Sequence, residues 1–132
     1  MASTPFTYLM AMIGSALGGG ARLWVSTLVA HGYGTEFPWG TMVVNAAGCF
    51  VVGILGALMS PIGPWHDVGE LRVFLVVGLL GGFTTFSAFS LESVLLVQRG
   101  QWAAALAYVC LTTLICLSAA ALSFYLMQQA LR

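Results

Sequence analysis

Charged residues are scarce in this chain. It has no lysine, and only 6% of its 132 residues are charged, while 60% are hydrophobic and the formal net charge is zero. Soluble domains carry about 25% charged residues, so this composition does not suit a surface that faces water. The absence of a basic patch also argues against nucleic acid as a partner. Together with a mean hydropathy of +0.98, these features predict an integral membrane protein in contact with the lipid bilayer.

Cysteine and histidine are also rare. The three cysteines, Cys49, Cys110 and Cys116, lie within apolar runs and have neither metal-ligand spacing nor the pattern of a disulfide framework, which is typical of small buried side chains. The two histidines lie between apolar runs, and no nucleophile has a base at a recognisable spacing, so the chain is not expected to be an enzyme. No basic residue precedes Arg22, as a cleavable signal peptide would require, and we expect the N-terminus to be retained.

Four apolar segments are long enough to cross a membrane, since a span needs about 20 residues. They cover approximately residues 6–30, 40–60, 72–97 and 102–129. Their runs are continuous and do not alternate with polar residues, which favours helices over a β-barrel. The sequence therefore predicts an all-α fold with four transmembrane helices in a single membrane domain, residues 1–132.

The arginines are divided almost evenly between the two sides that this topology defines. Arg72 and Arg132 share one side with the termini, and Arg99 lies on the other, where Arg22 also counts if its side chain extends to that interface. Because positive charge sets orientation, such a chain can insert both ways round. This predicts an antiparallel homodimer of dual topology.

The third span contains the segment "GGFTTFSAFS" (81–90), which is unusual for a membrane helix. Paired glycines give the backbone freedom, and threonine and serine can satisfy backbone groups released from a helix. Irregular backbone at membrane depth is tolerated where it is buried in protein or lines a cavity. We therefore predict a break in this span. Phe86 and Phe89 share one face after it, where their ring edges either face an anion or simply pack.

Three polar residues within the spans leave alternatives open. Arg22 forms an electropositive vestibule or extends to the interface, because a cation in the bilayer centre costs on the order of 3 kcal/mol. Asn45 makes an interhelical hydrogen bond or donates into a permeation path. Glu92 couples to protons, pairs with an arginine or stays protonated.

Two periodic patterns complete the set of candidates. Tyr108, Thr112 and Cys116 recur every four residues and so share one helical face. Their side chains either bond back to their own helix or line a narrow anion path. The small residues Gly14 and Gly18, and likewise Gly78 and Gly82, have the spacing of close helix contacts.

Three motifs together resemble those of the Fluc (CrcB) fluoride channels. They are "GSALGGGAR" (14–22), "GTMVVNAAGCF" (40–50) and "GGFTTFSAFS", and the likeness covers all four spans. The resemblance implies an antiparallel homodimer with two fluoride pores in a bacterial inner membrane. Such a channel lets toxic fluoride leave the cytoplasm.

The resemblance also implies roles for individual residues along the fluoride path. Phe86 and Phe89 would line the pores, one from each subunit in each pore. Asn45 would donate hydrogen bonds to fluoride near those rings. Tyr108 and Thr112 would belong to a polar track on the fourth span.

Further roles implied by the resemblance concern cations. Arg22 would be the vestibule arginine, and the backbone carbonyls of Gly81 and Thr84 from both subunits would surround one structural sodium ion at the dimer interface. Cys116 stands where the family more usually has a hydroxyl, which leaves its place in the track open.

Two other classes of function compete with this interpretation. A small multidrug-resistance transporter also has four short helices, but it carries its glutamate in the first span, where this chain has Arg22. A scaffold subunit would use its polar residues only to join helices, so that Asn45→Ala would harm dimer stability rather than ion flux.

Overall fold

The structure is a computed structural model that describes residues 4–132, and all regular elements in that range are helices. This confirms the predicted all-α class. The elements are α1 (Pro5–Tyr33), α2 (Trp39–Leu58), α3 (Gly69–Arg72), the π-helix η1 (Val73–Leu80), α4 (Gly81–Phe83), α5 (Phe86–Gln98) and α6 (Trp102–Ala130). The predicted third span, 72–97, thus corresponds to four consecutive helical segments, and the π-helical stretch within it was not predicted.

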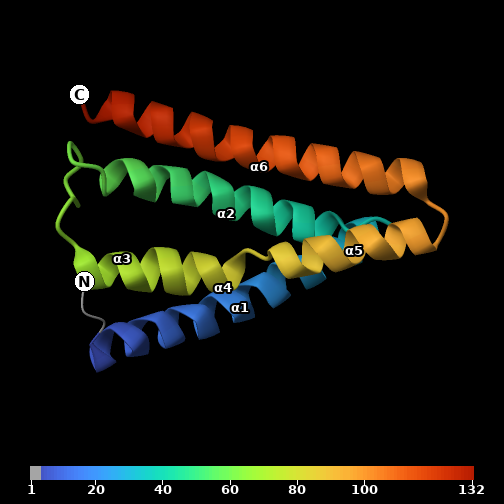
Figure 1. The fold of residues 1–132 in the computed structure, drawn as a ribbon, viewed down its shortest axis with the longest axis horizontal. Helices are drawn as coiled ribbons and strands as arrows, with labels where there is room; N and C mark the ends of the chain where they lie inside the picture. Colours follow the sequence, from blue (N-terminus) through green and yellow to red (C-terminus); the bar gives the residue numbers. More distant parts are fainter. Residues whose placement is uncertain (1–3) are drawn as a thin grey trace.

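The helices form two side-by-side layers. α2 lies along α6, and α1 crosses the run from α3 to α5, as Figure 1 shows. The start of α1, the loop after α2 and the C-terminus lie at one end, and the α1–α2 and α5–α6 connections lie at the other. The third span shares a layer with α1, and α2 of the other layer contacts α4 and α5 on the two sides of its break.

Local sequence signals explain where the first and third spans end. The Thr4 hydroxyl accepts the amide of Thr7 at 3.2 Å and caps α1, with Pro5 at the first helical position. Gly34 follows α1 with φ +80°, and Gly100 occupies the α5–α6 turn with φ +74°. Only glycine adopts this left-handed region without strain, so both turns depend on it.

Small residues bring α1 against the third span, as their spacing predicted. A Cβ built on Gly78 would lie 2.9 Å from the Cα of Gly14, and one built on Gly82 would lie 2.5 Å from the carbonyl oxygen of Ser15. A Cβ on Gly18 would collide with the Leu79 carbonyl. The two backbones therefore touch, and the predicted role of these glycines in close helix contact is confirmed.

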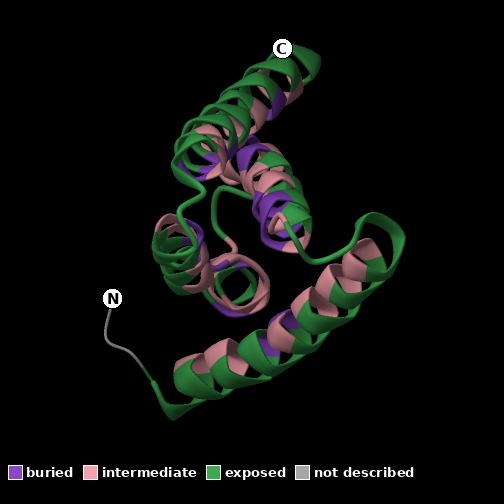
Figure 2. Cartoon of the chain, turned by 90° about the vertical axis from the view of Figure 1, so that its right-hand side faces the viewer, coloured by how far each residue is buried: buried purple, intermediate pink, exposed green. Residues whose placement is uncertain are grey.

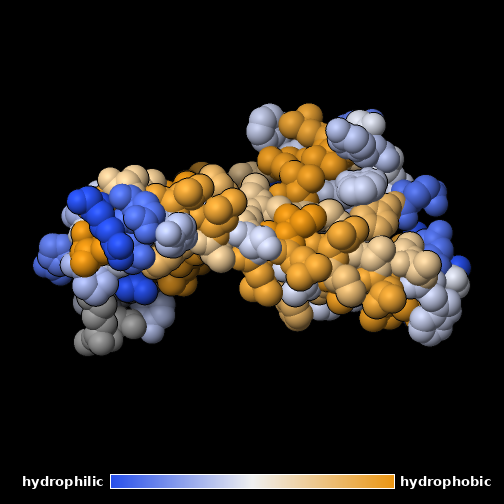
Figure 3. Space-filling model, turned by 90° about the horizontal axis from the view of Figure 1, so that it is seen from above, coloured by the Kyte–Doolittle hydropathy of each residue, from blue (hydrophilic) through white to orange (hydrophobic). Residues whose placement is uncertain are grey.

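Most of the molecular surface is apolar, and the helices of the chain do not cover it. Buried residues form narrow stripes between the helices, whereas the outer faces are exposed (Figure 2). In Figure 3 the hydrophilic residues gather at the two ends and hydrophobic side chains cover the stretch between them. This distribution fits a protein whose middle is surrounded by lipid rather than water.

Three helical stretches of residues 4–132 are long and apolar enough to cross a membrane: Trp39–Leu58, Gly69–Gln98 and Trp102–Ala130. They match three of the four predicted spans. α1 has 29 residues and is therefore about 44 Å long, enough to cross a bilayer. It is less apolar than the others because it contains Arg22, His31 and several glycines. A fourth span at α1 stays a prediction.

Candidate functional site

The third span is interrupted between α4 and α5, where the sequence predicted a break. Thr84 has φ −81° and ψ 158°, and Thr85 has φ −151° and ψ 119°, so both residues are extended. The Thr85 hydroxyl accepts the amide of Ala88 at 3.1 Å and caps the new helix. The hydroxyl thus satisfies a backbone group that the break releases.

Asn45 of α2 holds the break through its side-chain amide. Its Nδ2 donates to the carbonyl oxygen of Thr85 at 2.9 Å, and the amide of Thr85 donates to its Oδ1 at 2.8 Å. The sequence left two roles open for Asn45, and the structure shows the first of them, the interhelical hydrogen bond. An amide nitrogen carries two hydrogens, so Asn45 has a second donor beyond this bond. The donor function toward an anion stays a prediction.

The same contacts redirect the amides that would otherwise pair with two backbone carbonyls. In a continuous helix the amide of Thr85 would bond to the carbonyl of Gly81, and that of Ala88 to the carbonyl of Thr84. Here these amides donate to Asn45 and to the Thr85 hydroxyl instead. The two carbonyls thereby lose their helical donors. They are hard oxygen ligands of the kind that holds alkali cations at unwound helices.

A glycine on α2 makes room for the break. A Cβ built on Gly48 would collide with the Cγ2 of Thr84. The Thr84 hydroxyl bonds back to the carbonyl of Leu80 at 2.8 Å, which fixes its rotamer. The extended segment therefore packs tightly on the face of α2 that also carries Asn45.

A cavity of about 430 Å³ lies beside the break. It brings together most of the predicted site residues: Asn45, Gly81, Thr84, Phe86, Phe89 and Thr112. The ring centroids of Phe86 and Phe89 are 5.5 Å apart, but their environments differ. Phe89 is 9% exposed and packs against Tyr108, whereas Phe86 is 79% exposed. The two rings are therefore neighbours, but only that of Phe89 is enclosed by the chain itself.

The predicted hydroxyl face of α6 points into the protein. Tyr108 and Thr112 are buried, and Cys116 is half-buried at the cavity. Within residues 4–132, the Thr112 hydroxyl is buried and has no hydrogen-bond partner. The residue is only 4% exposed, so water does not readily replace that partner. It does not bond back to its own helix, as Ser90 and Ser93 do. Of the two alternatives for this face, Thr112 therefore fits a polar lining.

Glu92 of α5 accepts hydrogen bonds from two other elements. The Thr41 hydroxyl donates to Oε1 at 2.8 Å, and the Tyr108 hydroxyl donates to Oε2 at 2.7 Å. Phe89 and Phe37 pack on the Tyr108 ring, with centroids 5.1 Å and 5.4 Å away. The carboxylate is thus held in place next to the Phe89 side of the cavity.

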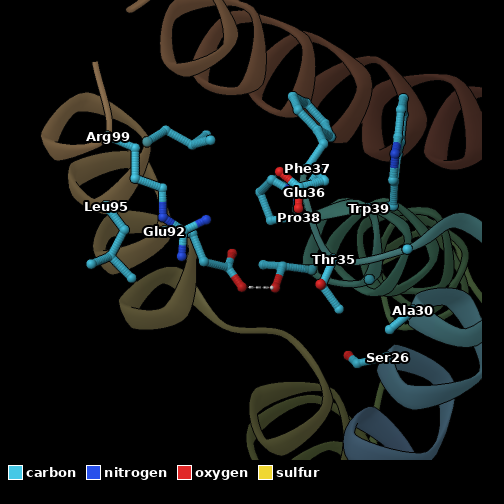
Figure 4. A pocket seen from close by; sticks show the side chains of 14 residues that line it. Ser26, Ala30, Thr35, Glu36, Phe37, Pro38, Trp39, Glu92, Leu95 and Arg99 are labelled. Atoms are coloured by element: carbon cyan, nitrogen blue, oxygen red, sulfur yellow. Dashed lines mark hydrogen bonds between the residues drawn. The ribbon is translucent and has the colours of Figure 1, made fainter. Parts of the chain in front are cut away.

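Glu92 and Thr41 also line a second, more polar cavity of about 260 Å³ at the end of the molecule with the α5–α6 turn. Figure 4 shows the side chains of Glu92 from α5 and of Arg99, the residue after α5, extending into it opposite the 34–38 loop. Tyr108 lines neither cavity, but it lies between them, since its ring packs on Phe89 of the first cavity and its hydroxyl donates to Glu92 of the second. Arg22 is half-buried on α1 and is not among the residues that line either cavity.

Sequence reasoning did not identify Thr41 or Gly48, and it left the partners of Glu92 open. A signal was present in the helical spacing. Thr41 lies four residues before Asn45, and Glu92 lies three residues after Phe89, so each shares a helical face with a predicted site residue.

Known proteins resemble this chain over most of its length. The family model described as CrcB-like protein, Camphor Resistance (CrcB), matches residues 9–124. A relative from Methylocella silvestris named Fluoride-specific ion channel FluC is 45% identical over 112 residues, which cover 85% of this chain and 86% of the relative. Proteins with the same name from Rhodospirillum rubrum and Rhodospirillum centenum are 45% and 50% identical, over 84% and 73% of this chain and 86% and 75% of the relatives.

Proposed function

The chain belongs to the CrcB family, and on this premise we propose that it is a fluoride-selective ion channel that lets fluoride leave the cytoplasm and so relieves fluoride toxicity. The proposed site is a bacterial inner membrane, with α1 as a fourth span beside the three apolar helical stretches. The observation that carries the proposal is the buried Thr112 hydroxyl without a partner, in a cavity that also contains Asn45 and Phe89.

Fluoride is small and strongly hydrated, so a pore must replace its water with donors that hold it loosely. The Thr112 hydroxyl and the second hydrogen of Asn45 Nδ2 are donors of this kind, since neither is a fixed charge. The ring edges of Phe86 and Phe89 carry partial positive charge and can contact the ion without trapping it. A bare buried cation would hold fluoride too tightly for release.

The Tyr108–Glu92–Thr41 group offers an exit from this cavity. An anion that reaches Tyr108 competes with Glu92 for the tyrosine hydroxyl, and the carboxylate repels it electrostatically. Passage to the polar cavity therefore requires the Glu92 side chain to move aside. Arg99 at that cavity would draw the anion outward, and Arg22 would attract anions at the vestibule on α1.

Two copies in antiparallel orientation would complete the pores. Phe86 is 79% exposed on a single chain while the adjacent Phe89 is buried, so a second copy gives Phe86 a pore-lining environment. Each of the two pores in a homodimer would then take Phe89 from one subunit and Phe86 from the other. Net charge zero and the even division of arginines suit insertion in both orientations.

A sodium ion would hold the two breaks together. The carbonyls of Gly81 and Thr84 have lost their helical donors to Asn45 and to the Thr85 hydroxyl. In an antiparallel dimer, the same two carbonyls from each subunit would otherwise point at one another without a partner. A cation between them supplies the missing positive charge and is structural rather than transported.

The test is anion release from proteoliposomes loaded with fluoride or chloride, followed with ion-selective electrodes. We expect fast fluoride release and little chloride release. Thr112→Val keeps the shape of the side chain and removes the hydroxyl, so fluoride release should fall about tenfold, the effect of losing one donor worth about 1.4 kcal/mol.

The matched control is Thr27→Val, because the Thr27 hydroxyl is exposed and bonds back to the Leu23 carbonyl at 2.8 Å. Its release rate should match that of the parent protein. Absence of fluoride release from protein shown to be dimeric and reconstituted would refute the channel, and proton-coupled export of a cationic compound through Glu92 would then be measured.

A further inference from the structure

Two of the three cysteines meet across the helix pair that lines the fluoride cavity. Cys49 lies on α2 and Cys116 on α6. One helical turn further along, the same two helices touch, because a Cβ built on Gly53 would collide with the carbonyl oxygen of Ala120, and this register places Cys49 opposite Cys116. Both are half-buried and both line the 430 Å³ cavity. Cys110 is exposed, also on α6 but outside the set of residues that line this cavity. The chain therefore has one thiol pair in the cavity and one thiol outside it.

A pair of facing thiols has the chemistry of a soft-metal site. Soft cations with a filled d shell, such as Ag⁺ and Cu⁺, prefer sulfur ligands and are satisfied by two thiolates on opposite sides of the ion. The cavity provides space and access to the pair.

We propose that Cys49 and Cys116 form a two-thiolate site for a soft monovalent cation, and that its occupancy obstructs the anion path. The second half of this statement rests on the proposed function, and the first half does not. Cys116 lies one helical turn beyond Thr112 on the same face. A metal ion at the pair would therefore lie beside the donor that the proposed path uses.

The charge balance explains why a bound cation would hinder an anion. Binding of one Ag⁺ between two thiols releases two protons to water, and two S–Ag bonds replace two S–H bonds. No electron is transferred. The site changes from neutral to a net charge of −1, and that charge lies in a region of low dielectric where it repels fluoride strongly.

The metal site is tested first without flux. Purified dimeric protein carrying Cys110→Ser is titrated with silver nitrate in chloride-free buffer, and bound silver and released protons are counted. We expect one Ag⁺ and two protons per chain. Adding Cys116→Ser should weaken silver binding by at least about tenfold and reduce the protons released to one, since a single thiolate remains. Equal affinity in the two variants would overturn the site.

The obstruction is tested in proteoliposomes by comparing each variant with its own silver-free rate of fluoride release. Silver should slow the Cys110→Ser protein at least about tenfold and leave a variant that lacks all three cysteines unaffected. Excess dithiothreitol should restore the rate. Equal inhibition of the variant without cysteines would overturn the obstruction. If the silver-free protein releases no fluoride, the proposed function fails, whereas the silver titration still decides whether the site exists.

Discussion

Replacing Asn45 by alanine should destabilise the fold and allow the third span to close across its break. The side-chain amide makes two hydrogen bonds to the backbone of Thr85, at 2.9 Å and 2.8 Å, in a buried position. Alanine removes both partners. The amide of Thr85 is then free to bond to the carbonyl of Gly81, as it would in an uninterrupted helix.

The magnitude follows from these two contacts. A buried polar group left without its partner costs about 1–3 kcal/mol, so two would cost about 2–6 kcal/mol. Recovery of the helical bond to Gly81 returns about 1 kcal/mol, and membrane hydrogen bonds fall at the low end of such ranges, at about 0.6–2 kcal/mol. We therefore expect the free energy of unfolding to fall by about 1–3 kcal/mol. Because the Gly81 carbonyl regains a donor, the response of stability to sodium should weaken as well.

The measurement is equilibrium unfolding of the purified protein in mixed micelles by increasing mole fraction of dodecyl sulfate, with and without sodium, alongside fluoride release. Ser93→Ala is the matched control, since its hydroxyl in the same span bonds only to the carbonyl of Phe89 at 2.7 Å. It should change stability by less than about 0.5 kcal/mol. An Asn45→Ala protein that loses fluoride release while keeping its full stability and its sodium response would refute the supporting role and assign Asn45 to the ion alone.

Three further outcomes are expected. Gly48→Ala places a Cβ against Thr84 and should destabilise the protein by about 1–3 kcal/mol in the same unfolding assay. The control Gly20→Ala should leave stability unchanged, because a Cβ there meets no described atom within 4 Å. Equal effects of the two substitutions would contradict the tight fit at Gly48. Tyr108→Phe removes the 2.7 Å hydrogen bond to Glu92. Fluoride release should slow about tenfold, because a donor worth about 1.4 kcal/mol is lost. An unchanged rate of release would show that Tyr108 is not part of the path. Replacing sodium by a large organic cation should weaken the dimer, and an unchanged dimer dissociation constant would count against a structural ion.

The sequence predicted the break itself because its cause is local. Gly81 and Gly82 followed by hydroxyl residues are unfavourable in a helix at membrane depth, and the structure breaks two residues later. The spacing of Tyr108 and Thr112 likewise predicted a shared face, because helical periodicity needs no knowledge of neighbours. Both outcomes depend on residues close together in the chain.

The partners of the polar groups could not be obtained in this way. Asn45 and Thr85 are 40 residues apart, and Thr41 and Glu92 are 51 residues apart, so their pairing depends on how α2 docks on the third span. The sequence left two roles open for Asn45, a link between helices and a donor to an ion. It gave no sign that the link would be to the broken backbone. The π-helix was missed for a related reason. It packs closely on α1, and no local motif in the sequence marks it.

The π-helix of η1 has a consequence for how relatives of this chain can differ in length. A π-helix has about 4.4 residues per turn against 3.6 in an α-helix, so its eight residues fall about 0.4 of a turn behind, which is the rotation of one to two residues. The stretch Val73–Leu80 thus takes up at least one extra residue between the charged start of the span and Gly82, which contacts α1. A relative with one residue fewer here would wind this stretch as an ordinary α-helix and keep the later motif in phase. Single-residue gaps in alignments of the family should therefore fall within this stretch, upstream of the break.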